Sequence, residues 1–186
     1  MKGWEIGGCS GQGWVLYLAG MIIRDEKSSD IEAIGAVTKA AFADCRYGEH
    51  TEQFIILALR KAGALSVSLV AEDEGCVVGH IAFSPVKIGG RQCGWYGLGP
   101  ISVLPELQRQ GIGKALMREG LERLEAMGAK GCMLVGEPKY YERFGFRNRA
   151  GLVLEGVPEE NFVALAFGDD EACGAVEFHE GFGANC

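Results

Sequence analysis

Apolar residues recur along the first half of the chain with two different periods, which predict a mixture of helices and strands. Behind Ser28-Ser29-Asp30, which offers helix caps, apolar residues at 31, 34, 37, 41 and 42 form one face of a helix. A second helix is expected over 49–62, ended by Gly63. Apolar and β-branched runs between turn residues predict strands at 21–24, 66–72, 76–86 and 92–103.

The second half of the chain continues the alternation with shorter elements. The pattern predicts a helix at 113–127, a buried strand at 131–135, a short helix at 139–144, and strands at 162–167 and 175–178. Gly128 and Gly145 are suited to end the two helices. This order predicts an α+β fold made of an antiparallel meander, a β-loop-α-β unit and a final hairpin.

Residues 1–20 differ from the rest of the chain. They are rich in Gly and Trp and lack a helical or strand period, whereas Met21 opens the first predicted strand. We expect either that Met21 is the natural start or that residues 1–20 form a loosely held extension. Residues 21–186 suit a single domain of ordinary size.

Composition and charge narrow the classes of partner. The formal net charge is −7, so the surface repels phosphate backbones, and a nucleic-acid partner is not expected. No apolar run reaches the ~18 residues of a membrane span, and no signal-peptide pattern is present, so we expect a cytoplasmic protein without a membrane partner. The seven cysteines contain no Cys-x-x-Cys pair, which argues against a metal site and favours small buried apolar residues.

One segment predicts an anion-binding site, because it joins a predicted strand to a predicted helix through glycines. It reads Gln108-Arg109-Gln110-Gly111-Ile112-Gly113-Lys114-Ala115. The first amides of a helix are unpaired, the helix dipole is positive there, and glycines let a ligand approach the backbone. These properties suit a pyrophosphate, although a plain tight turn would use the same residues. Neither the dinucleotide-fold fingerprint nor the P-loop spacing is met.

The same segment resembles the Gln/Arg-x-x-Gly-x-Gly/Ala signature of the GNAT acetyltransferases, and residues 104–108 resemble the lead-in to that signature. Downstream, Tyr140-Tyr141-Glu142-Arg143-Phe144-Gly145-Phe146 resembles the F-Y-x-x-x-G-F element of that family. Two motifs in the expected order are more specific than either alone. On these residues the chain is identified as a member of the GNAT superfamily, over roughly residues 21–180.

The resemblance implies a mixed, mostly antiparallel sheet of about seven strands with about four flanking helices. This sheet would splay between the strands at about 98–103 and 131–136, and the pantetheine part of acetyl-CoA would lie in the gap. Gly97, Gly99 and Pro100 fit either a plain kink or a bulge that frees a backbone N–H to polarise the thioester carbonyl. The residues implied in cofactor binding are Ile101, Ser102, Val103, Gln108, Arg109, Gln110, Gly111, Ile112, Gly113, Lys114 and Ala115, with the amides of 109–115 on the pyrophosphate.

The resemblance also assigns Tyr141 as the general acid that protonates the departing thiolate, with a core aromatic as the alternative. Many relatives carry a Glu near 96–101 and an Asn after the strand at 131–136, and this sequence has neither. The identity of the general base therefore stays open. Basic side chains near the loop could bind the 3′-phosphate of coenzyme A or simply lie in solvent. The candidate bases are Glu72, His80, Glu137, His50 or a water chain, and the candidate phosphate ligands are Arg109, Lys114 and Arg118.

Together these expectations describe an acyl-CoA-dependent N-acyltransferase. It would transfer acetyl from acetyl-CoA to a primary amine, small molecule or peptide, by direct attack in a ternary complex. A homodimer is compatible with the family. The alternative is a non-catalytic module of the same fold that senses acyl-CoA, and release of the coenzyme A thiol in the presence of amines distinguishes the two.

Overall fold

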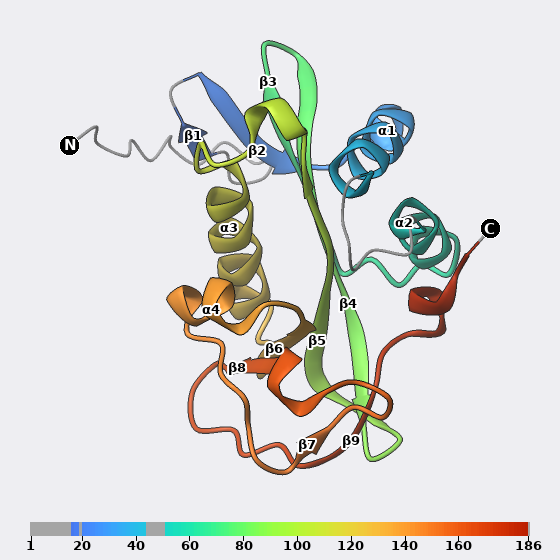
Figure 1. Cartoon of the computed structure of the whole chain (residues 1–186), viewed down its shortest axis with the longest axis vertical. Coiled ribbons are helices and arrows are strands. Elements are labelled where there is room, and N and C mark those ends of the chain that lie inside the picture. The colour runs from blue at the N-terminus through green and yellow to red at the C-terminus, as the bar shows by residue number, and fades with distance from the viewer. Residues whose placement is uncertain (1–15, 19, 44–50, 186) are drawn as a thin grey trace.

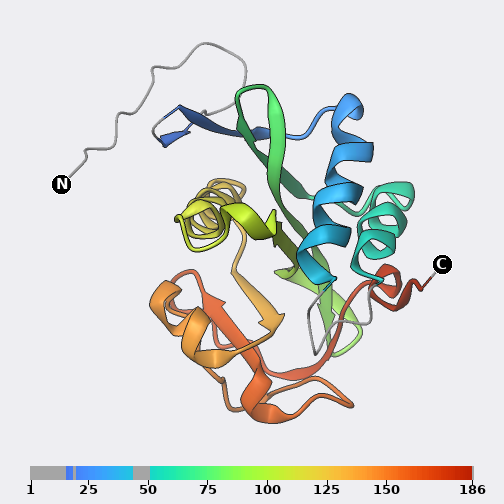
Figure 2. The ribbon, with the colours of Figure 1, turned by 45° about the horizontal axis from the view of Figure 1, so that its top comes forward.

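The computed structural model describes residues 16–18, 20–43 and 51–185 of the chain. One mixed sheet runs through the molecule (Figure 1). Helices α1 (Ile31–Phe42) and α2 (Glu52–Lys61) pack together on one face, and α3 (Ile112–Ala126) covers the other (Figure 2). The sequence therefore builds a helix–sheet–helix arrangement around one strand system.

The first part of the sheet is an antiparallel meander, as the sequence predicts. Its strands are β1 (Leu16–Leu18), β2 (Met21–Asp25), β3 (Val67–Asp73), β4 (Cys76–Ile88) and β5 (Arg91–Val103). β1 belongs to the segment expected as an extension, and it pairs with β2. Residues 1–15 lie outside the described residues, so the expectation of a loosely held extension stays a prediction.

The second part of the sheet follows α3. Strand β6 (Gly131–Val135) runs parallel to β5, and β8 (Phe162–Ala166) is antiparallel to β6. Helix α4 (Pro138–Tyr141) continues into a 3-10 turn at Glu142–Phe144, as expected for the short helix at 139–144. The other 3-10 turns are Ser28–Asp30, Pro105–Leu107, Glu159–Asn161 and Glu180–Gly183. The mixed, mostly antiparallel sheet with flanking helices is confirmed.

The expected final hairpin is wrong, because β8 and β9 (Gly174–Glu177) do not pair with each other. β9 instead pairs with the end of β4 and with β7 (Leu152–Val153). The connection between them is held elsewhere: Trp95 donates a hydrogen bond of 2.9 Å to Asp170, and Lys130 lies 3.3 Å from the same carboxylate. These long-range contacts carry the chain away from β8 before β9 begins.

Three apolar clusters form the described core, and the smallest, made of Ile34, Ile56 and Val70, joins α1 and α2 to β3. The one under α3 contains Ile81, Phe83, Leu116, Met117 and Leu134, and the one near β9 contains Trp95, Met133, Phe162 and Val176. Gly120 lets α3 lie against the sheet, since a Cβ there would be 2.4 Å from the Phe83 ring. This close packing fixes the position of the first turn of α3, beside the end of β5.

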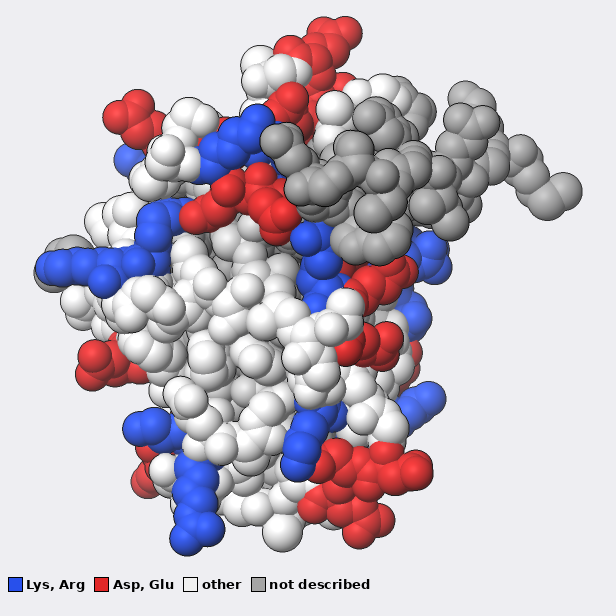
Figure 3. Space-filling view, turned by 180° about the vertical axis from the view of Figure 1, so that it is seen from behind, with Lys and Arg blue, Asp and Glu red and all other residues white. Residues whose placement is uncertain are grey.

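Within the described residues, no helix combines the length and the apolar character of a membrane span. The described cysteines are free, but only Cys132 is fully buried, whereas Cys76 and Cys173 are exposed, so the burial predicted for the cysteines holds only in part. On the face shown in Figure 3, charged side chains of both signs surround a central uncharged area.

A polar network beneath α2 ties three elements together. Glu26 accepts hydrogen bonds from Arg60 at 2.7 Å and from the Ser68 hydroxyl at 2.6 Å. The Ser68 proton is used on Glu26, so the 2.8 Å contact with His80 requires that His80 Nε2 donate. Burial raises the pKa of Glu26, but hydrogen bonds from His80, Arg60 and Ser68 outweigh burial and hold that pKa well below its ordinary value. Burial lowers the pKa of His80, so the neutral imidazole is the folded form.

The network makes folding stability depend on pH. Because the pKa of Glu26 is lowered in the folded chain, its carboxylate stabilises the fold above pH 4.5, the ordinary pKa of the group. This stabilisation is lost progressively as the pH falls below that value. His80 adds a loss that starts below 6.5, because only the unfolded chain then takes up its proton. We expect Glu26→Gln to lower the free energy of unfolding by about 1–3 kcal/mol at pH 7, with the gap shrinking below pH 4.5. Urea denaturation from pH 7 to pH 3 measures the gap.

The matched control is Glu171→Gln, which changes an exposed carboxylate in the connection to β9. It should leave the free energy of unfolding unchanged at every pH. A gap between Glu26→Gln and the unaltered chain that stays constant down to pH 3 would contradict the stabilising role of the Glu26 carboxylate.

Candidate functional site

The site forms where strands β5 and β6 separate. Their parallel pairing ends at Gly97 and Met133, while β6 continues to pair with β8 through Val135. The rest of β5 therefore parts from β6, and the splay expected near 98–103 and 131–136 is confirmed.

A bulge in β5 lies beside this separation. Pairing with β4 passes from Ile81–Ile101 to Phe83–Leu98, so β5 contains one more residue than β4 over this stretch. The extra length falls at Gly99 and Pro100, which are joined by a cis peptide bond. Proline has no N–H to give to the ladder, and a bulge leaves one residue unpaired. The bulge predicted at these residues is present.

On one side of the gap lies a cavity of about 510 Å³, here called the cationic pocket. Its charged side chains are all basic: Arg109, Lys114 and Arg143. Arg109 and Lys114 make no ion pair with any described residue, and the Arg143 guanidinium lies 4.8 Å from the Tyr140 ring centre. The remaining lining residues are Ile101, Ser102, Val103, Leu107, Gln108, Gly111, Gly113 and Tyr140.

The backbone of the cationic pocket is shaped for an anion. Arg109 has φ +62° and Gly111 has φ +96°, and the left-handed conformation at Arg109 is uncommon for a residue with a side chain. Gln108 anchors the loop by donating to the Val103 carbonyl at 3.1 Å. The first hydrogen bond of α3 runs from the Ala115 amide to the Gly111 carbonyl, so the amides before Ala115 have no intrahelical acceptor. Three of the residues that carry such amides, Gly111, Gly113 and Lys114, line the pocket, as expected of an anion site at a helix start.

The structure brings most of the predicted cofactor residues together. Eight of them line the cationic pocket: Ile101, Ser102, Val103, Gln108, Arg109, Gly111, Gly113 and Lys114. The side chains of Ile112 and Ala115 are buried in the core, and Gln110 is exposed with its amide on the Glu106 carbonyl. The Ala115 amide is used within the helix, so the expected run of free amides ends at Lys114. Arg118 lies outside the pocket lining.

Tyr141 follows β6, so it lies on the opposite side of the gap from the start of α3, which follows β5. Its ring packs over Gly136, where a Cβ would be only 2.5 Å from a ring carbon. The ring centre is 4.9 Å from that of Tyr140 and 6.0 Å from that of Phe146, both edge-on. Burial raises the pKa of Tyr141 to about 12, so the phenol is protonated at neutral pH. Its hydroxyl makes no hydrogen bond to any residue that the structure describes.

Tyr141 lines a second cavity, of about 400 Å³, here called the acidic pocket. Its charged side chains are Glu52 and Glu155, and no basic residue contributes to its lining among the residues described. Ile101 lines both pockets. The remaining walls are mostly apolar and consist of Phe42, Ile55, Leu98, Gly99, Pro100, Val135, Leu154, Val157, Phe178 and Phe182.

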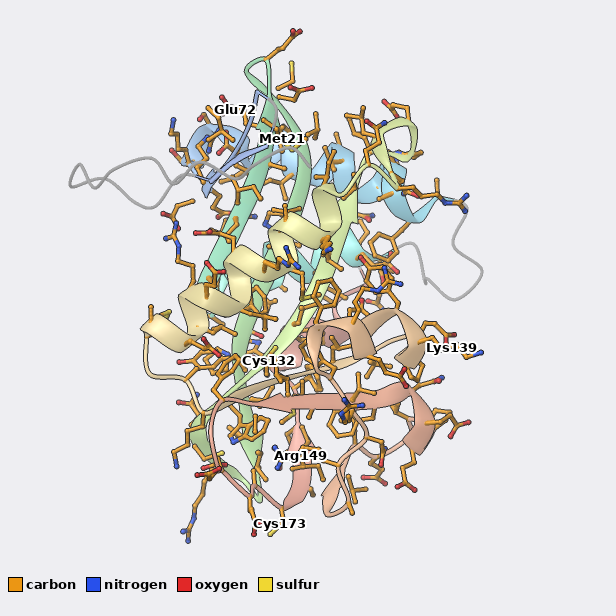
Figure 4. All side chains as sticks on the ribbon, turned by 90° about the vertical axis from the view of Figure 1, so that its left-hand side faces the viewer. Met21, Glu72, Cys132, Lys139, Arg149 and Cys173 are labelled. Atoms are coloured by element: carbon orange, nitrogen blue, oxygen red, sulfur yellow. The ribbon has the colours of Figure 1, made fainter. Side chains whose placement is uncertain are left out.

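None of the described candidate bases reaches either pocket. Glu72 is bound to Arg24 at 2.8 Å and lies beside Met21, at the end of the sheet remote from Lys139 on α4 (Figure 4). His80 is fully buried in the network under α2, and Glu137 is exposed outside both linings. His50 lies outside the described residues.

Sequence reasoning missed Glu52 and Glu155. Glu52 had a local signal, because it lies on the buried stripe of α2 with Ile56 and Leu59, at positions where a charge is unexpected. Glu155 had none, since it follows β7 on an irregular segment that only the fold brings to the gap.

Comparisons with known proteins agree with this geometry. A family model described as an acetyltransferase (GNAT) domain matches residues 64–148. The N-acetyltransferase YhbS of Escherichia coli is 34% identical over 87% of this chain and 98% of its own length. A crystal structure of that protein with CoA has a TM-score of 0.80 at 32% identity, covering 88% of this chain and 92% of the other. A GNAT family acetyltransferase from Brucella melitensis, crystallised with acetyl-CoA, is 50% identical with a TM-score of 0.79, covering 87% and 97%.

The geometry of the cationic pocket predicts the effect of filling it. A Cβ on Gly113 would lie 3.5 Å from the Tyr140 hydroxyl and 3.7 Å from Val103, which are ordinary contacts, so Gly113→Leu should fold. Its side chain would occupy the space beside the free amides. We expect coenzyme A to raise the melting temperature of the unaltered chain and not that of Gly113→Leu. Thermal scans with and without coenzyme A measure the difference.

Gly35→Leu is the control, because it places the same side chain on α1 at a position with nothing within 4 Å of the new Cβ. It should keep the full response to coenzyme A. A folded Gly113→Leu protein with an undiminished response would show that the phosphates bind elsewhere.

Proposed function

We propose that this chain, which belongs to the GNAT acetyltransferase family, transfers an acetyl group from acetyl-CoA to a primary amine by direct attack within a ternary complex. The observation that carries the proposal is the pair of pockets of opposite charge that share Ile101 where β5 and β6 part. An anionic donor suits one pocket and a cationic acceptor suits the other. Two separate pockets allow both substrates to be bound at once, as direct transfer requires.

The cationic pocket fits the phosphates of coenzyme A. Arg109, Lys114 and Arg143 supply positive charge, and the amides at the start of α3 supply donors. Gly111 and Gly113 leave space for the ligand beside these amides. When bound there, acetyl-CoA supplies an activated thioester carbonyl for the amine to attack. A backbone N–H between residues 98 and 101, freed by the bulge, would polarise that carbonyl.

The linings of the two pockets argue for direct transfer over a covalent acyl-enzyme. No cysteine lines either pocket among the described residues, and Ser102 is the only hydroxyl of the serine–threonine type there. The Ser102 hydroxyl is buried and lies 3.1 Å from that of Thr38, and no described histidine in either lining could activate it. The acceptor amine is therefore the nucleophile that this site provides for.

Tyr141 would return a proton to the departing sulfur. Its raised pKa, about 12, keeps the phenol protonated until it is needed. The same low-polarity surroundings disfavour a bare thiolate, since burial also raises the pKa of the nearby Cys132 thiol. Burial thus favours the protonated form of the leaving thiol, and Tyr141 would supply that proton as the thiolate develops.

Replacing Tyr141 by Phe deletes only the proposed donor and keeps the ring that packs over Gly136. We expect unchanged stability and unchanged coenzyme A binding. Single-turnover rates of acetyl transfer should fall by on the order of 10²-fold, the lower end of general acid catalysis. Rapid-quench measurements with saturating acetyl-CoA and an acceptor amine provide the rates.

Tyr96→Phe on β5 is the matched control, because Tyr96 is half-buried and lines neither pocket. Its single-turnover rate should equal that of the unaltered chain. If Tyr141→Phe also transferred acetyl at the unaltered rate, Tyr141 would have no part in the proton transfer. If the unaltered chain bound acetyl-CoA and released no thiol with any amine, the alternative of a sensor would replace the enzyme.

A further inference from the structure

The acidic pocket contains a buried carboxylate with one oxygen that has no partner among the described residues. Glu52 is in the first turn of α2 and only 9% of its surface is exposed. Its Oε2 atom is buried and has no hydrogen-bond partner among the described residues. A buried carboxylate without a partner is costly, so such groups are kept where a ligand completes them. Because Glu52 lines the acidic pocket, the missing partner is expected to come from whatever occupies that pocket.

The walls around Glu52 describe the rest of the occupant. Phe178 and Phe182 come from the segment after β9 and meet edge-on, with ring centres 4.9 Å apart. They approach β5 closely because it has glycines there: a Cβ on Gly97 would be 2.4 Å from Phe178, and one on Gly99 would be 3.2 Å from Phe182. Ile55 and Leu98 extend this apolar surface. An apolar body gains by burial here, whereas a polar chain would lose its hydration without compensation.

The charge of the pocket selects the polar end of the occupant. Its two charged side chains are both carboxylates, Glu52 inside and Glu155 on the exposed rim. A cation is therefore attracted at the mouth and held at the buried end, and a carboxylate or phosphate on the acceptor would be repelled at both places.

We propose that the acceptor is a primary amine on an uncharged apolar body, and that Glu52 binds its ammonium group and takes the proton that must leave before attack. This inference rests on the proposed acetyl transfer and names the acceptor class and the base for it. Glu52 and Tyr141 line the same pocket, so base and acid would face one acceptor. Among the described residues, Glu52 is the only carboxylate buried in that lining.

The protons balance with these two residues. The ammonium gives one proton to the Glu52 carboxylate, which turns a buried ion pair into a neutral pair and leaves a nucleophilic amine. The nitrogen–carbonyl bond then forms and the carbon–sulfur bond breaks. The nitrogen loses its second proton as the amide forms, and the sulfur gains one from Tyr141, so those two transfers cancel once the phenol is reprotonated. The proton on Glu52 is released to water, and the carboxylate is restored.

The test compares 2-phenylethylamine with spermidine, using release of the coenzyme A thiol for turnover and calorimetry in the presence of coenzyme A for binding. We expect 2-phenylethylamine to bind and react with a kcat/KM at least ten times that of spermidine. In Glu52→Gln, kcat/KM for 2-phenylethylamine should fall by on the order of 10²-fold or more, with losses in both amine binding and kcat. Coenzyme A binding should be unchanged, and Glu52→Asp should recover part of the rate.

Stability gives an independent reading. Because Glu52 Oε2 is buried and has no partner among the described residues, Glu52→Gln should have a melting temperature equal to or above that of the unaltered chain. Glu171→Gln, outside both pockets, should change neither kinetics nor melting temperature. Glu155→Gln should reduce kcat/KM by less than about tenfold, with a loss that shrinks as salt is added.

Different results would overturn different parts of the proposal. Equal kinetics in Glu52→Gln, or a marked loss of its stability, would overturn the role of Glu52. A preference for spermidine would overturn the apolar acceptor. If 2-phenylethylamine bound the unaltered chain through Glu52 but no thiol were released, the pocket assignment would stand and the proposed acetyl transfer would fail.

Discussion

The loss of pairing between β5 and β6 beyond Gly97 and Met133 is the constraint on which the site depends. A sheet closed along its whole length would leave no room between these strands. Here β6 stays paired with β8, whereas β5 stays paired with β4 through a bulge at Gly99 and Pro100, so the two halves of the sheet diverge. The N-terminus of α3 and the end of α4 lie on the two sides of the opening. Both pockets, and the residue they share, are consequences of that divergence.

The two pockets are separated in charge, and this separation follows from ordinary local rules. Basic side chains and free amides gather where α3 begins, because a helix start after a glycine loop attracts anions. Carboxylates gather on the other side, with Glu52 in the first turn of α2 and Glu155 at the exposed rim. In the proposed reaction, this separation would keep a donor that carries phosphates and an acceptor that carries an ammonium from exchanging places. Specificity of this kind uses repulsion as well as attraction.

The sequence predicted the parts of the molecule that local patterns determine. The meander, α3 within a residue at each end, and the glycine-containing loop before α3 all follow from short-range periodicity and glycine placement. The acidic pocket could not be read in this way, because α1, α2, the β5 bulge and the segments after β7 and β9 each contribute only a few residues. The predicted pairing of the final strands was wrong for the same reason. The connection between β8 and β9 is held by contacts such as the hydrogen bond from Trp95 to Asp170, which joins residues 75 apart in the chain. Glu52 is the intermediate case, since its place on an apolar stripe was visible but resembles an ordinary acid in the first turn of a helix.

The central claim is that donor and acceptor occupy their own pockets at the same time and meet at Ile101. Initial-rate measurements that vary acetyl-CoA at several fixed concentrations of an acceptor amine test this most directly. A ternary complex predicts double-reciprocal lines that intersect, together with no exchange of label between acetyl-CoA and free coenzyme A in the absence of amine. Parallel lines with such an exchange would indicate an acetylated enzyme and would contradict direct transfer between the two pockets.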